Sequence, residues 1–208
     1  MSIIDQLASR VGTRQEAPNE KVARLCVEHP EYLNEIQDNL KSKDKRVQGD
    51  CAEVFAEVAK IKPELTAKYI EDLLTMLATK NNRALWEGLA AISLVAPLTA
   101  DRIYPHKDEL LHLARTGSVI VVDGAVSTLG KVAAHADSYN TEIFPELLTL
   151  LETCIPRDIP RLGEFILPAV RDNGEFKSKM KRVLEKRLQE CQNKTAERRV
   201  RKVIAQLE

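Results

Sequence analysis

The chain has 208 residues, of which 44% are hydrophobic and 30% are charged, and its formal net charge is zero. This composition supplies enough apolar side chains for a continuous core. A net charge of zero excludes a global field that would draw the protein onto nucleic acid or a membrane surface. No apolar run approaches the roughly 18 residues that a membrane span needs, and the N-terminus lacks the pattern of a secretory signal.

The first 18 residues are predicted to precede the main domain. Residues 2–10 are expected to form a short amphipathic helix, opened by Ser2 and Asp5 in a capping-box pattern. Residues 12–18 have the composition of a linker. A truncated first pair of helices is then expected over residues 19–40, with a break at Pro30. The predicted division is therefore residues 1–18 and residues 19–208.

The rest of the chain repeats with a period of 37 residues. Several columns of apolar residues are separated by that step, including Leu73, Leu110, Leu147 and Leu184; Val58, Val95 and Val132; and Phe55, Ile92, Leu129 and Ile166. A fixed period of this length is the signature of a stacked repeat architecture. Full units are expected to begin near residues 45, 82, 118 and 156.

Each unit contains two helical patterns. In the first full unit, Cys51, Phe55 and Val58 lie at i, i+4 and i+7, which places them on one face of a helix. A second pattern over residues 69–77 follows a break at Lys62–Pro63, and the next unit has its break at Pro97–Leu98. Residues 195–208 match the first helix alone, so they are expected to cap the stack with a basic outer face.

The column formed by Ala56, Ser93 and Gly130 is small in every layer, which would let neighbouring helices approach closely. One helix pair cannot cover its own apolar face, so stacking completes the core. The period, the paired helices and this small column resemble the HEAT-repeat family of armadillo-type solenoids, from about residue 19 onward. The period is slightly shorter than the usual HEAT length of about 40 residues, and no regular Asp-to-Arg ladder is present.

The resemblance implies an all-α fold, a right-handed α-solenoid of about five antiparallel helix pairs with a terminal capping helix. It also implies a curved superhelix whose second helices line the concave face and hold a partner. Acidic residues recur on these helices, and the sign changes in the last layer. The predicted partner-binding residues are Glu71, Asp72, Asp108, Glu109, Glu142, Glu146, Lys179, Arg182, Lys186 and Trp86. The alternative interpretation of the charged residues is an ordinary solvated helix face, and that of Trp86 is packing against the next layer.

No catalytic, cofactor or metal site is predicted. The sequence has no GxSxG, HExxH or phosphate-binding glycine loop. His106 shares an apolar column with Tyr69, Ile143 and Met180 and is interpreted as a core-facing histidine. The four cysteines (Cys26, Cys51, Cys154 and Cys191) are widely spaced without a CxxC motif, which favours reduced thiols and a cytoplasmic location.

The sequence therefore predicts a non-enzymatic scaffold that binds a protein or peptide partner, as a monomer or small oligomer. The alternative is a HEAT-like DNA-binding protein, such as a repair enzyme similar to the alkylpurine DNA glycosylases. Residues 171–208 carry 12 Lys and Arg against 6 Asp and Glu, so a phosphate contact at this end belongs to that alternative. No membrane contact is expected.

Overall fold

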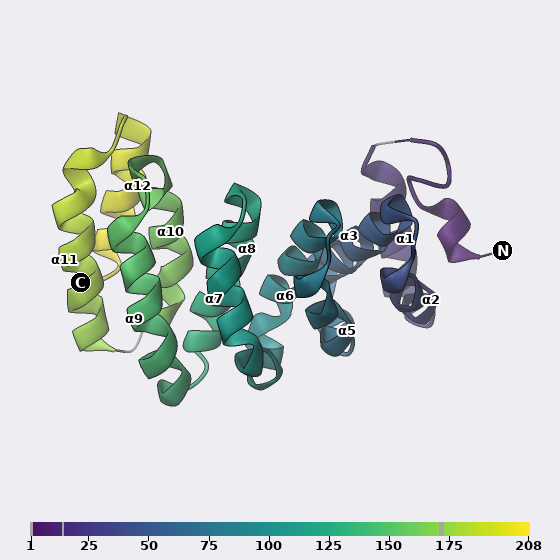
Figure 1. The fold of residues 1–208 in the computed structure, drawn as a ribbon, viewed down its shortest axis with the longest axis horizontal. Coiled ribbons are helices and arrows are strands. Elements are labelled where there is room, and N and C mark those ends of the chain that lie inside the picture. The colour runs from purple at the N-terminus through teal and green to yellow at the C-terminus, as the bar shows by residue number, and fades with distance from the viewer. Residues whose placement is uncertain (1, 14, 171–172) are drawn as a thin grey trace. The chain divides into compact units, whose positions relative to one another are not determined.

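A computed structural model describes residues 2–13, 15–170 and 173–208, and these residues contain helices and connecting turns but no β-strand (Figure 1). The chain divides into two compact units, residues 1–106 and residues 107–208. The third predicted helix pair is split at this division. Within the described residues, no helix is both long and apolar enough to cross a membrane.

The first unit consists of successive helix pairs. Its elements are η1 (Ile3–Gln6), α1 (Ala17–Glu28), α2 (Tyr32–Asp38), η2 (Asn39–Lys41), α3 (Lys45–Ile61), α4 (Pro63–Ala67), α5 (Ile70–Leu74), η3 (Thr75–Ala78), α6 (Asn82–Ile103) and η4 (Tyr104–His106). Helix α3 packs against α1 on one side and α6 on the other, while α5 packs against α6. The central helix of this unit is therefore enclosed by its neighbours.

The second unit repeats the arrangement. Its elements are α7 (Lys107–Thr116), α8 (Val119–Ala133), α9 (Asp137–Thr153), η5 (Pro156–Asp158), α10 (Ile159–Ile166), η6 (Leu167–Val170), α11 (Gly174–Arg187), η7 (Leu188–Glu190) and α12 (Lys194–Ala205). Helix α10 packs between α8 and α12, and α9 packs against α8 and α11. Helix α12 is the predicted terminal helix, and its buried residues Val200 and Val203 face the stack.

The predicted boundaries of the 37-residue repeats agree with local capping chemistry. Asp44 accepts a hydrogen bond from the amide of Arg46 at the start of α3, and Asn193 accepts one from Ala196 at the start of α12. These side chains satisfy amides that the first turn of a helix leaves unpaired. Pro63 opens α4, where its missing N–H costs nothing. The breaks predicted at Pro30 and Lys62–Pro63 are confirmed.

Two local predictions need correction. The helix predicted over residues 2–10 is only a 3₁₀ turn, Ile3–Gln6, capped by the Ser2 hydroxyl. At Leu7 the backbone becomes extended (φ −63°, ψ 152°), and Leu7 and Ala8 are buried in the unit. In the second case, the break predicted at Pro97–Leu98 is present one residue later, because two helical segments of α6 meet at a kink at Thr99 (φ −135°, ψ 21°). Arg14, within the predicted linker, lies outside the described residues.

The apolar columns form the core. Phe55, Ile92, Leu129 and Ile166 are each fully buried, and Val203 continues their column at 1% exposed. The small column is also buried, with Ala56 at 1% and Ser93 at 7% exposed. In the second unit, a Cβ atom added at Gly130 would lie 2.2 Å from the carbonyl oxygen of Phe165, so α8 and α10 are in backbone contact there. The close approach predicted for this column is present at Gly130.

Replacing Gly130 by alanine should destabilise the protein by roughly 1–3 kcal/mol, because the added methyl group meets backbone that cannot rotate away. The matched control is Gly163→Ala in α10, where the added Cβ would be in ordinary contact with Leu184 at 3.4 Å. That substitution should stabilise the helix by about 0.5–1 kcal/mol. Urea unfolding measures both; a neutral Gly130→Ala would contradict the packing.

Candidate binding pocket in the first unit

The middle of α3 carries two buried carboxylates. Asp50 is fully buried and Glu53 is 4% exposed, because α1 and α6 cover α3 on opposite sides. Arg83 on α6 joins them: its Nη1 lies 2.7 Å from Asp50 Oδ1, and its Nη2 lies 2.5 Å from Glu53 Oε2. Buried charges require such partners, since their desolvation is costly. The single guanidinium therefore bridges two acids.

The same acids hold the N-terminal segment. The Asn19 side-chain nitrogen donates to Asp50 Oδ1 at 3.0 Å and to Glu53 Oε2 at 2.6 Å. Its Oδ1 accepts from the amide of Ala8 at 2.9 Å, and the amide of Ser9 donates to Asp50 Oδ2 at 2.8 Å. Since Asn19 is fully buried, this network fixes residues 8 and 9 against α1 and α3.

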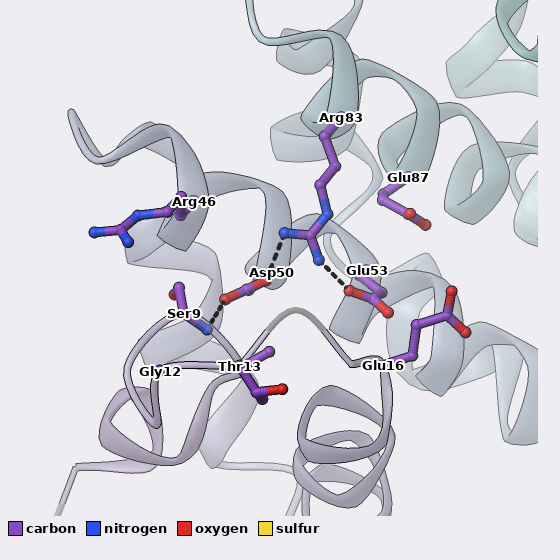
Figure 2. Close-up of a pocket in the computed structure, with 10 residues that line it drawn as sticks. Ser9, Gly12, Thr13, Glu16, Arg46, Asp50, Glu53, Arg83 and Glu87 are labelled. Atoms are coloured by element: carbon purple, nitrogen blue, oxygen red, sulfur yellow. Dashed lines mark hydrogen bonds and ion pairs between the residues drawn. The ribbon is translucent and has the colours of Figure 1, made fainter.

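A pocket of about 550 Å³ opens beside this network (Figure 2). It is lined by Ala8, Ser9, Gly12, Thr13, Glu16, Arg46, Asp50, Glu53, Arg83 and Glu87. Gly12 has a φ of +79°, a conformation suited to glycine, and the turn there places Thr13 in the wall. Figure 2 shows Arg83 reaching between Asp50 and Glu53, whereas the guanidinium of Arg46 is directed away from Glu53 and Glu87. The lining carries more acidic than basic side chains.

Glu87 differs from the other acids of the pocket. No hydrogen bond or ion pair joins it to another residue that the structure describes, although Arg83 is on the preceding turn of α6. Burial, together with the nearby charges of Glu53 and Glu57, raises the pKa of Glu87 from 4.5 to about 7, against the opposing effects of Arg83 and Lys60. Burial also raises the pKa of Glu53. Among the residues that the structure describes, the lining of the pocket is thus short of positive charge.

This arrangement suits a cationic group. Carboxylates around a partly buried cavity accept charge-assisted hydrogen bonds from guanidinium or ammonium nitrogens. The described residues contain no group of three or more His, Cys, Asp or Glu side chains placed to hold a metal ion. An unpartnered titratable group in a cavity is also a recognised sign of a functional site.

Replacing Glu87 by glutamine should raise the free energy of unfolding at about pH 8 by about 1 kcal/mol, a value reduced for the partial exposure of this side chain. The folded chain binds the Glu87 proton more tightly than the unfolded chain does. The Glu87 contribution to stability therefore falls as pH rises from 4.5 to about 7. The gain from the variant should be absent at about pH 4, below both pKa values. Urea unfolding across pH measures it, and equal stability of the two proteins at all pH values would contradict the burial of charge.

The predicted acidic residues of the first unit lie outside this pocket. Glu71 is exposed and pairs with Arg102 at 2.8 Å, and Asp72 pairs with Lys41 at 3.7 Å. Trp86 is half-buried on α6 and does not line the pocket, although Glu87 follows it in sequence. His106 is half-buried, and its interpretation as a core-facing histidine stays a prediction.

The predicted residues of the second unit are also on its surface. Glu142 pairs with Lys107 at 3.5 Å, and Glu146 pairs with Arg115. Asp108 and Glu109 are exposed on α7. On α11, Lys179 pairs with Glu175 at 2.6 Å, and the other two predicted residues, Arg182 and Lys186, are exposed.

Sequence reasoning missed the pocket residues, although a signal was present. Asp50 and Glu87 share one column at the 37-residue step, as do Arg46 and Arg83. The acid–arginine pairs that join neighbouring first helices have irregular separations, and so escaped a search at fixed period. They are Asp50–Arg83, Asp123–Arg161 and Glu164–Arg199, whose residue numbers differ by 33, 38 and 35.

Comparison with known proteins identifies the fold class. No family model matches the sequence, and no curated protein matches it. Among solved structures, a designed armadillo repeat protein in complex with the peptide (KR)4 superposes with a TM-score of 0.72 at 17% identity, over 99% of this chain and 98% of that one. A computationally designed armadillo repeat protein for modular peptide recognition gives 0.71 at 16%, with 99% and 98% coverage.

An engineered protein gives a TM-score of 0.69 at 15% identity, over 100% of this chain and 97% of that chain. Similarity at this level of identity concerns the fold. The chain is an all-α solenoid of the armadillo type, as the repeat pattern predicted.

Proposed function

We propose that this protein is a non-enzymatic scaffold that binds a basic segment of a protein partner, and that the pocket of the first unit receives one lysine or arginine side chain of that segment. The observation that carries the proposal is the surplus of carboxylates among the described residues that line the pocket. Arg83 is shared by Asp50 and Glu53, while Glu87 and Glu16 line the same cavity. An incoming cation would supply the missing charge.

The structural neighbours support the ligand class. One designed armadillo repeat protein was solved with the peptide (KR)4, which consists of basic residues alone. A peptide of this kind offers a guanidinium or ammonium group at every position, each of which forms strong hydrogen bonds with carboxylates. Electrostatic complementarity of this type contributes to partner choice and to the association rate. A cytoplasmic location is part of the same proposal.

The acids predicted on the second helices are a second candidate for binding the partner. That a concave face lined by the second helices holds the partner stays a prediction. The ion pairs of these acids weigh against a dominant role, since Glu71, Asp72 and Glu146 each have a basic neighbour. Exposed pairs of this kind leave little unbalanced charge.

The (KR)4 peptide, acetylated and amidated, is the probe for the pocket. The double variant Glu16→Gln/Glu87→Gln should bind it about tenfold more weakly than the unaltered protein, equivalent to about 1.4 kcal/mol. The control variant Glu28→Gln loses one charge from an exposed position on α1 outside the pocket, and should bind nearly normally. Fluorescence anisotropy at about pH 8 measures the affinities. Equal affinity of the double variant and the control would contradict the proposal.

The surface of the second helices is tested separately with the triple variant Asp72→Lys/Glu109→Lys/Glu146→Lys. Under the pocket proposal, its affinity for (KR)4 should fall only about threefold, through long-range repulsion that salt screens. Complete loss of binding with retained helicity by circular dichroism would place the peptide on that surface instead.

The DNA-binding alternative is tested with the unaltered protein. Duplex DNA, tested in a gel shift at low salt, should show only weak retention, because the basic side chains Lys179, Arg199 and Arg201 are paired with acids. Tight binding that weakens steeply with added salt would favour the alternative.

A further inference from the structure

The pocket of the first unit contains a built-in response to pH. We infer that binding of a cationic side chain there is coupled to loss of a proton from Glu87, so that the site binds strongly above neutral pH and weakly below it. This inference rests on the proposed function, because it concerns the regulation of the same pocket.

Among the acids that α3 and α6 contribute to the cavity wall, Glu87 is the one without a hydrogen-bond or ion-pair partner in the described part of the chain. Asp50 and Glu53 share the Arg83 guanidinium, with distances of 2.7 and 2.5 Å, and both also accept hydrogen bonds from Asn19. Their charge is thereby stabilised by fixed partners. Glu87 lines the same cavity without such a partner among the described residues.

The charges that face Glu87 come from three segments. Helix α3 contributes Glu53, Glu57 and Lys60, α6 contributes Arg83, and the segment before α1 contributes Glu16 to the pocket wall. Lys60 is engaged by Glu57, its Nζ lying 2.5 Å from Glu57 Oε1. Its attraction for Glu87 is correspondingly reduced. The two described cations, Arg83 and Lys60, do not offset the combined effect of burial and of the neighbouring acids.

These surroundings raise the pKa of Glu87 to about 7. At that value the carboxyl is roughly half protonated at neutral pH. A cationic side chain entering the pocket interacts much more strongly with the carboxylate than with the neutral acid. It therefore lowers the pKa of Glu87, and the carboxyl O–H bond breaks with its proton passing to solvent. By linkage, lowering the pH must then weaken the binding of the cation.

The experiment is isothermal titration of the whole protein with acetylated, amidated (KR)4 at about pH 8 and about pH 6, in pairs of buffers that differ in ionisation enthalpy. The affinity should fall about tenfold between these pH values, as the carboxylate fraction of a group with a pKa of about 7 does. Heats that depend on the buffer at about pH 6 should report proton release on binding. The peptide itself has no group that titrates in this interval.

The variant Glu87→Gln is the matched test, because it is close in shape and retains every histidine of the chain. It should bind weakly and with the same affinity at both pH values, whereas Glu28→Gln should keep the tenfold dependence. Circular dichroism at both pH values establishes that each protein is folded. Full pH dependence in Glu87→Gln would overturn the inference, since another group would then be responsible.

The two proposals fail in different ways. If the unaltered protein binds (KR)4 equally at both pH values, the proton coupling is wrong and the binding function stands. If it binds at neither pH, the proposed function itself is wrong. A carbon-13 titration of the Glu87 side-chain carboxyl supplies a direct reading: saturating peptide should lower its pKa, and an unchanged pKa would refute the coupling.

Discussion

The enclosure of helix α3 by its neighbours is the constraint on which the rest of residues 1–106 depends. Helix α3 has α1 on one side and α6 on the other, so the side chains on both flanks are removed from water. The apolar column residue Phe55 gains from this burial, whereas Asp50 and Glu53 would be strongly destabilising without partners. Arg83 and Asn19 supply those partners, and the N-terminal segment is held in place by the same groups.

The charges around the pocket lower the stability of the folded chain. One guanidinium shared by two carboxylates does not neutralise them, and Glu87 adds a further acid to the same low-dielectric region. Replacing one partner of such a network is more damaging than a surface change, because it leaves a buried charge uncompensated. An arrangement that disfavours its own charge state is expected where function takes precedence over stability.

The contrast with the acids of the second helices concerns their surroundings. Glu71 is exposed to solvent and already paired with Arg102, so water and salt screen its field. Glu87 is half-buried without an ion-pair partner among the described residues, and its pKa is raised to about 7. Charges in partly desolvated sites interact more strongly than those on an open surface. For this reason the pocket is the better candidate for recognition of a cationic group.

The sequence by itself determined the helix pairs, the positions at which the 37-residue repeats begin, and the buried columns. These depend on the spacing of apolar residues along one chain, as with Phe55, Ile92, Leu129 and Ile166, and periodicity is a local property. The 37-residue period also selected the charged residues of the predicted partner-binding set. It did not predict the ion pairs that these residues form. Only the tertiary structure decided that Asp50, Glu53 and Glu87 meet around Arg83. The separations of the pocket residues along the chain follow from how neighbouring helices are offset and how the N-terminal segment folds back. The repeat pattern predicts neither of these.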